Sequence, residues 1–199
     1  MALLKPHRLE YPFTPEQVGS LRAGQFVLVS GLVYTGRDRF HKHLFEGGKS
    51  PVDLKNSAVY HCGPVVVRKE AEWVVRAAGP TTSVREEPYL PKIIKEHGVR
   101  VIIGKGSMGK VTEDACKAGG AVYLHAVGGT AQVLAGKVVA VRGLHLTEFG
   151  LTEAMWVLEL KDFPAIVAID SRGRSLLRKI QSSSRRIGHK LIHSADPFQ

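Results

Sequence analysis

The stretch "VRVIIGKGSMGKVTEDACKAGGAVYLHA", residues 99–126, decides the fold class of this chain. It opens with an apolar, β-branched run over 99–103, which is typical of a buried strand and passes into a Gly-Lys-Gly loop. Residues 110–119 then predict a helix, and residues 121–126 predict a second strand. A strand, a helix and a strand in this order predict an α/β domain, because a crossover helix joins neighbouring parallel strands.

The same alternation continues on both sides of this stretch. Thr14 and Pro15 predict the N-cap and first residue of an early helix. Thr152 and Glu153 resemble a helix cap, so we expect residues 151–160 to begin as a helix. The early strands suggest a second, more antiparallel layer, and the fold class is therefore α/β with a mixed, partly parallel sheet. Further strands are predicted at 25–34, 57–63, 72–79, 137–146 and 164–171, and helices at 38–45, 87–98 and 172–180.

Length and composition exclude several classes of protein. The chain has 199 residues, of which 44% are hydrophobic and 23% are charged, as in an ordinary globular protein. We expect a single domain over residues 1–180 and a basic tail over residues 181–199. No apolar run reaches the ~18 residues that a membrane span needs. The N-terminus "MALLKPHRLEYPF" lacks the apolar segment of a signal peptide, so a soluble, cytoplasmic protein is expected.

The positive charge is concentrated near the C-terminus. The net charge is +10, and Ser171 to Lys190 holds seven Lys or Arg residues and no acidic residue. A solvated, partly disordered tail would explain this distribution. A binding surface for an acidic partner such as nucleic acid would also explain this distribution, but we favour the solvated tail.

The two cysteines, Cys62 and Cys116, both lie in apolar company. Buried, unreactive thiols are the simpler interpretation, and a disulfide framework is not expected. Two thiolates are also fewer than the three or four that an iron–sulfur cluster usually takes.

Polar side chains follow four of the predicted strands. Because ligands of open α/β sheets bind at the carboxyl ends of strands, these loops are the first place to look for a site. Arginine grips carboxylates through two parallel hydrogen bonds, so a small dicarboxylate is a suitable ligand, although a phosphate would suit too. The loops carry Thr35, Arg37, Asp38, His41 and Lys42; Thr81, Thr82 and Arg85; Lys105 and Ser107; and His125 and Thr130.

Each of these residues also has a plain structural interpretation. Thr81 and Thr82 could cap a helix, and Arg85 could pair with Glu86 or Glu87 on the surface. The histidines lack the spacing of a metal site, so no metal ligand is predicted.

Six motifs occur along the chain in the order "VSGLVYTGRDRFHK", "VYHCGPV", "GPTTSVREEPY", "VIIGKGSMG", "AVYLHAVGGTA" and "EFGLTEAMWVLELKDFPAIVAIDSRGRSL". Taken together, they resemble the β-subunit, or C-terminal domain, of the class I fumarases and L-tartrate dehydratases. The resemblance runs from about residue 20 to residue 178, and the combination is specific although no single motif is. It implies a swivelling β/β/α domain.

The resemblance implies a hydro-lyase with a [4Fe–4S] cluster, whose cysteine ligands lie in a partner α-subunit. The leading hypothesis is the β-subunit of a two-subunit fumarate hydratase, assembled as a hetero-oligomer of α and β pairs, with L-tartrate dehydratase as the alternative. Two other classes stay open. One is a nucleic-acid-binding module that acts through the basic tail, and the other is a non-catalytic partner that only stabilises the α-subunit.

The resemblance also implies roles for single residues. Thr81 matches the proton-abstracting group, and Lys105 is placed with it as catalytic, while its counterpart also contacts a substrate carboxylate. Arg37, Arg85, Thr82 and Asp38 are expected to bind the substrate. We expect Thr81 and Arg85 to share one face of a helix turn, and Lys105 or Asp38 to activate the threonine. Phe40 departs from the family pattern, which has a small residue there.

Overall fold

The computed structural model of the chain describes residues 5–70 and 72–194. Within them, seven strands form one sheet: β1 (His7–Glu10), β2 (Phe26–Thr35), β3 (Ala58–Tyr60), β6 (Val101–Gly104), β7 (Val122–His125), β8 (Val138–His145) and β9 (Met155–Ile169). β4 (Val65–Lys69) and β5 (Glu72–Ala77) form a separate hairpin. The helices are α1 (Pro15–Ser20), α2 (Asp38–Phe45), α3 (Leu90–Glu96), α4 (Lys110–Gly119), α5 (Ala131–Ala135) and α6 (Leu176–Ser194), with short 3₁₀ helices η1 (Ser83–Glu86) and η2 (Thr147–Phe149).

The large sheet closes into a ring, because β2 and β9, which are not neighbours in the strand order, also form a long antiparallel pair. One edge of β2 carries β1 and then β3, and the outer edge of β9 carries β8 and then β7. β6 lies between β3 and β7 and completes the ring. β1, β2, β3, β6 and β7 run parallel, whereas β9 is antiparallel to its neighbours, which confirms the predicted mixed, partly parallel sheet.

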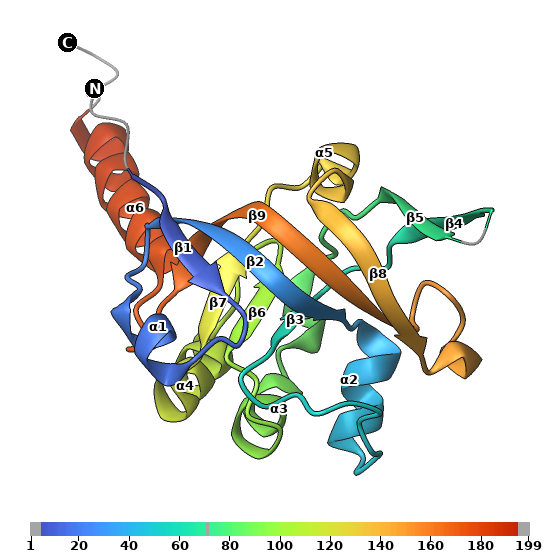
Figure 1. Ribbon diagram of the computed structural model, residues 1–199. Coiled ribbons are helices and arrows are strands. Elements are labelled where there is room, and N and C mark those ends of the chain that lie inside the picture. The colour runs from blue at the N-terminus through green and yellow to red at the C-terminus, as the bar shows by residue number, and fades with distance from the viewer. Residues whose placement is uncertain (1–4, 71, 195–199) are drawn as a thin grey trace.

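The short parallel strands are buried on both faces, and alternate side chains serve two separate cores. In β6, Val101 and Ile103 face the interior of the ring, whereas Ile102 faces the helices. β3 and β7 follow the same alternation. The outer core packs against α2, α3 and α4, which lie in a row along one side of the sheet (Figure 1). This two-sided burial explains why the strands are nearly continuous apolar runs.

The hairpin of β4 and β5 is the predicted antiparallel second layer. It lies with α5 on the side of the sheet opposite to α2, α3 and α4 (Figure 1). Trp73 of β5 meets Trp156 of β9 edge to face, with ring centroids 5.5 Å apart, and so joins the hairpin to the ring. Other local predictions are confirmed too: Thr14 caps α1 by accepting a hydrogen bond from the Gln17 amide.

The predicted helix at the start of residues 151–160 is wrong. Thr152 and Glu153 lie in a turn, and a single strand, β9, runs from Met155 to Ile169. The residues of β9 alternate between the two cores along much of its length. The sequence did not reveal this strand, because a buried strand and a buried helix can both give an apolar run. The cap-like side chain of Glu153 serves another helix instead: its Oε2 accepts the Arg39 amide in the first turn of α2, at 3.0 Å.

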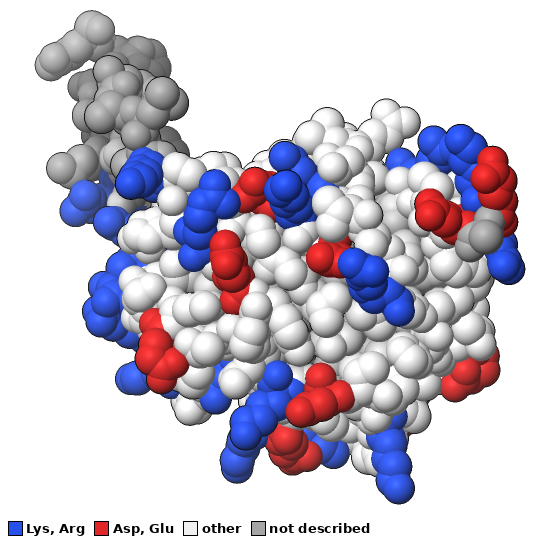
Figure 2. Space-filling view, in the orientation of Figure 1, with Lys and Arg blue, Asp and Glu red and all other residues white. Residues whose placement is uncertain are grey.

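The last helix is longer than predicted, because α6 continues to Ser194. Most of the residues that the sequence analysis placed in a partly disordered tail are therefore helical. Two of the basic side chains pair with the body of the domain: Arg174 with Asp170 at 2.7 Å, and Arg178 with Glu113 at 2.9 Å. Basic side chains gather on the edge of the molecule beside α6, while both signs alternate across the rest of the visible face (Figure 2). No helix in the described ranges is long and apolar enough to cross a membrane.

Candidate active site

The predicted site residues meet where β2, β3 and β6 end, because a short extended segment is inserted between two of these strands. We call this segment, Thr81–Ser83, the wedge. The Thr81 amide donates to the His61 carbonyl, just past β3, at 2.7 Å. On its other side, the Lys105 amide donates to the Thr81 carbonyl at 3.3 Å, and the Ser83 amide donates to the Lys105 carbonyl at 3.1 Å. The wedge thus prolongs the sheet and places Thr81 and Thr82 beside Lys105.

The expectation that Thr81 and Arg85 share a helix turn is wrong. Thr81 precedes the 3₁₀ helix η1 and takes part in strand-like pairing, with a bridge between Thr82 and Lys105. Thr82 occupies the N-cap position of η1 but makes no capping hydrogen bond through its side chain. The Thr81 hydroxyl instead donates to the His61 carbonyl at 2.9 Å. The hydroxyl proton is thus engaged, and the lone pairs of Oγ remain able to accept a further hydrogen bond.

Arg85 is paired with Asp38 rather than with Glu86 or Glu87. Its Nε donates to Asp38 Oδ1 at 3.0 Å and its Nη2 to Oδ2 at 2.9 Å, which makes two parallel bonds. Both side chains are nearly half exposed. The pair joins η1 to the first turn of α2, so the Arg85 guanidinium is held in one plane at the surface of the site.

Arg37 precedes α2 and is anchored from the turn before β9. Its Nη1 donates to the Thr152 carbonyl at 3.3 Å, and its Nη2 lies 3.3 Å from Glu153 Oε1. Glu153 therefore holds both the Arg37 side chain and the start of α2. The sequence analysis missed this role, since it assigned Glu153 to a helix of its own.

Lys105 is placed by the loop that follows β6. Gly106 has a φ of 85°, a left-handed conformation that favours glycine and turns the chain away after Lys105. Glu87, from the end of η1, closes this loop: its Oε1 accepts the amides of Gly109 at 2.8 Å and Thr112 at 3.1 Å. The Glu87 carboxylate, just after the loop that carries Thr81 and Arg85, thus caps α4, the helix that follows the Lys105 loop.

A buried polar cluster lies behind the wedge and consists of His41, His61, Ser83 and Glu86, all inaccessible to solvent. His41 Nδ1 donates to the Arg37 carbonyl at 2.9 Å, and its ring meets that of His61 edge to face at 4.8 Å. Burial lowers the pKa of His41 to about 4 and that of His61 well below its usual range. Burial, with Asp38 nearby, raises the pKa of Glu86 to about 8. At neutral pH the cluster therefore carries no net charge.

The six predicted site residues therefore lie at one end of the sheet, past the carboxyl ends of its parallel strands. Arg37, Arg85 and Lys105 bring three positive charges to it, and Asp38 and Glu153 bring two negative charges. A small dianion bound at this end of the sheet would find excess positive charge and the hydroxyls of Thr81 and Thr82. The sequence predicted no metal-binding role for the histidines, and it did not reveal that Ser83 and Glu86 are buried beside His41 and His61.

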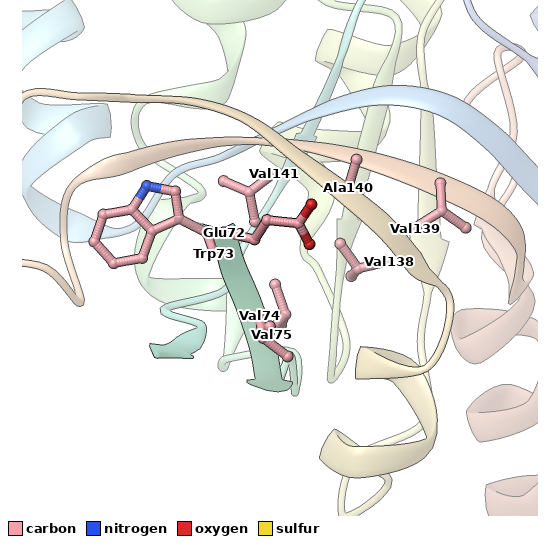
Figure 3. Close-up of a pocket in the computed structure, with 8 residues that line it drawn as sticks. All are labelled: Glu72, Trp73, Val74, Val75, Val138, Val139, Ala140 and Val141. Carbon is pink, nitrogen blue, oxygen red and sulfur yellow. The ribbon is translucent and has the colours of Figure 1, made fainter. Parts of the chain in front are cut away.

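A groove elsewhere on the molecule is unsuited to a dianion. It holds about 190 Å³ between β5 and β8, and Figure 3 shows valines and Trp73 around it, with the Glu72 carboxylate between the strands. Its single charged group is negative, so it would repel a dicarboxylate.

The cysteines of this chain do not fit an iron–sulfur cluster. Cys62 and Cys116 are both buried, and they belong to the two different cores. Burial raises the pKa of each thiol to about 12, whereas a cluster ligand must be a thiolate. In the described part of the chain, no group of three or more His, Cys, Asp or Glu side chains is arranged to hold a metal ion.

Comparison with known proteins shows which family the chain belongs to. Residues 5–180 match the family model described as Fumarase C-terminus. A Geobacillus stearothermophilus protein named as a class I fumarate hydratase is 50% identical over 177 residues, which are 88% of this chain and 34% of that protein. The chain thus spans about a third of the length of this relative.

Two further relatives are named as β-subunits of L(+)-tartrate dehydratase. The protein from Escherichia coli K12 is 35% identical over 171 residues, 85% of each chain. The one from Methanocaldococcus jannaschii is 39% identical over 181 residues, 86% of this chain and 93% of that protein.

Proposed function

The chain belongs to the Fumarase C-terminus family, and from this premise we propose that it is the β-subunit of a two-subunit fumarate hydratase. The reaction is the reversible hydration of fumarate to S-malate. The observation that carries the proposal is the wedge, which holds the Thr81 hydroxyl beside Lys105, with Arg37 and Arg85 at the neighbouring strand end. The higher identity to the protein named as a fumarate hydratase favours fumarate over tartrate.

The proposed partner is an α-subunit that carries the [4Fe–4S] cluster. The relatives that match this chain over most of their length are named as β-subunits, which supports a separate partner chain. The described cysteines of this chain do not fit the cluster, so its ligands are assigned to the α-subunit. The proposed assembly is a cytoplasmic hetero-oligomer of α and β pairs.

In this proposal the chain binds the two carboxylates and moves one proton. The guanidinium groups of Arg37 and Arg85 orient the dicarboxylate, and Asp38 and Thr82 line the same entrance. In the dehydration direction, Thr81 first releases its hydroxyl proton to solvent, and the alkoxide Oγ then takes the proton from the carbon next to the one that loses its hydroxyl. In the hydration direction, Oγ returns that proton.

A threonine hydroxyl is a weak base unless a neighbour lowers its pKa. Asp38 is already engaged by Arg85, whereas Lys105 is bonded to Thr81 through the backbone. We therefore assign the activation to Lys105, because a nearby ammonium group stabilises the negative charge that develops on Oγ.

The deciding experiment compares the chain alone with the chain co-expressed with its α-subunit. Both preparations are assayed anaerobically on fumarate, S-malate and L-tartrate. We expect the isolated chain to be colourless and inactive, and the complex to be brown and to interconvert fumarate and S-malate faster than it dehydrates tartrate. A brown, active preparation of the isolated chain would contradict the two-subunit proposal, and a preference for tartrate would replace the substrate.

A further inference from the structure

The buried side chains behind the wedge form a continuous link between Thr81 and Lys105. The Ser83 hydroxyl lies 2.8 Å from His61 Nδ1 and 3.2 Å from the Lys105 amide nitrogen. The amide can only donate, so Ser83 Oγ accepts from Lys105, and the same oxygen forms a second hydrogen bond with His61 Nδ1. The backbone carbonyl of the same histidine accepts both the amide and the hydroxyl of Thr81. One histidine is therefore bonded to both ends of the wedge.

The hydrogen bond between Ser83 and His61 forms with either neutral tautomer of the ring: Nδ1 accepts from the hydroxyl, or Nδ1–H donates to the second lone pair of Oγ. Burial, together with the nearby His41 and Arg85, lowers the pKa of His61 well below its usual range, so the ring is neutral. Nε2 has no hydrogen-bond partner among the described residues. Ser83 thus makes the hydrogen bond that orients the ring, and the edge of His41 packs against it.

The neighbouring backbone is shaped to let the Ser83 hydroxyl in. A Cβ atom at Gly104 would lie 1.8 Å from Ser83 Oγ and 3.1 Å from His61 Nδ1. Gly104 is the last residue of β6 and directly precedes Lys105. The absence of a side chain at this position lets the hydroxyl sit between the histidine and the strand.

From these contacts we propose that His61 and Ser83 are positioning residues that lock the Thr81 hydroxyl and Lys105 at a fixed separation for proton transfer. Both are inaccessible to solvent, so they act through the wedge rather than by touching the substrate. The catalytic part of this inference rests on the proposed hydratase function. A displacement of about 1 Å at reacting groups can lower a rate on the order of 100-fold, so the lock has a measurable effect on turnover.

The chain offers a matched control for the loss of a buried serine. Ser57 immediately precedes β3, and its buried hydroxyl donates to the Leu54 carbonyl at 2.6 Å, at the end of the strand opposite to His61. Ser57→Ala and Ser83→Ala each remove one buried hydroxyl. The difference between them therefore isolates the bonds to His61 and Lys105 from a general loss of stability.

The first measurement is amide hydrogen exchange in the full chain, which needs no substrate. In Ser83→Ala we expect exchange of the Lys105 and Thr81 amides to accelerate about ten-fold or more, while Ser57→Ala leaves both amides at the wild-type rate. Equal exchange at these amides in the two variants would overturn the lock, whatever the activity of the complex.

The second measurement is steady-state kinetics of the α–β complex. Ser83→Ala should lower kcat about ten-fold or more and change KM less than about three-fold, since the carboxylate clamps are untouched. His61→Leu should behave like Ser83→Ala, whereas His61→Asn should restore most of the turnover, because its side-chain amide can either accept or donate a hydrogen bond at the place of Nδ1.

The two arms separate failure of this inference from failure of the proposed function. Faster exchange combined with wild-type kcat would show a lock that does not serve catalysis and would overturn the positioning role. A wild-type complex inactive on all three substrates would instead refute the hydratase function, and exchange would still decide whether the lock exists.

Discussion

Arg85 and Asp38 lie 47 residues apart in the chain and are joined by two parallel hydrogen bonds of 3.0 and 2.9 Å. The bonds tie η1 to α2 and fix the guanidinium where two of the site loops meet. The pair is nearly half exposed, so it adds little to stability, at most about 1 kcal/mol. Its main effect is to hold the plane of the Arg85 guanidinium against the first turn of α2.

Asp38→Asn should therefore affect binding more than folding. We expect KM of the complex to rise several-fold, because Arg85 loses the charged partner that holds its plane, while the melting temperature changes little. Glu159→Gln, which breaks the exposed pair with Arg142 on β8, is the control and should leave KM unchanged. An unaltered KM in Asp38→Asn would place Arg85 outside the substrate site.

Arg37→Lys keeps the charge but loses the planar fork that bonds both Thr152 and Glu153. We expect KM to rise and kcat/KM to fall roughly ten-fold or more in the assembled enzyme. Steady-state kinetics on fumarate provide the measurement. Wild-type kinetics in this variant would show that Arg37 serves only to anchor the turn before β9.

The burial of Glu86 makes the free energy of unfolding depend on pH. Burial raises its pKa from 4.5 to about 8, so the folded state keeps a proton that the unfolded state releases above pH 4.5. The free energy of unfolding should fall as pH rises from about 5 to 8, with a slope of at most about 1.4 kcal/mol per pH unit. Denaturant titrations of Glu86→Gln should show a flatter profile and a gain in stability that is larger at pH 8 than at pH 5. An equal gain at both pH values would mean that Glu86 is ionised in the folded chain.

Much of this architecture follows from local sequence patterns. Apolar, β-branched runs correctly predicted strands such as 25–34, and Thr14 with Pro15 correctly predicted the start of α1. The polar loops also follow strands as predicted, since Arg37 comes just after β2 and Lys105 comes directly after β6. These features depend on residues close together in the chain, where periodicity and capping preferences are informative.

The features that could not be predicted depend on contacts between distant segments. The wedge is held by backbone hydrogen bonds to His61 and Lys105, which leave no side-chain pattern in "GPTTSV". Glu153 and Glu87 cap α2 and α4 from other parts of the chain, so a search for caps within each helix misses them. The roles of Thr81, Thr82, Lys105 and the arginines in catalysis stay predictions until their variants are measured.

The proton-transfer role of Thr81 is tested by comparing two variants, each of which removes the hydroxyl of one threonine. Thr81 and Thr130 each donate their hydroxyl to a backbone carbonyl, at 2.9 Å and 2.7 Å, so both alanine variants lose a similar bond. Loss of that bond alone costs about 1 kcal/mol of stability. Thr130→Ala is therefore the matched control for any structural effect.

The most direct measurement is kcat for fumarate hydration by the α–β complex that contains Thr81→Ala, determined anaerobically beside the wild type and Thr130→Ala. The account predicts a fall in kcat of about 100-fold or more, with KM nearly unchanged, because the arginines still bind the carboxylates. Thr130→Ala should turn over at the wild-type rate. A Thr81→Ala complex with a lowered melting temperature but wild-type kcat would contradict the account and leave this threonine with a structural role alone.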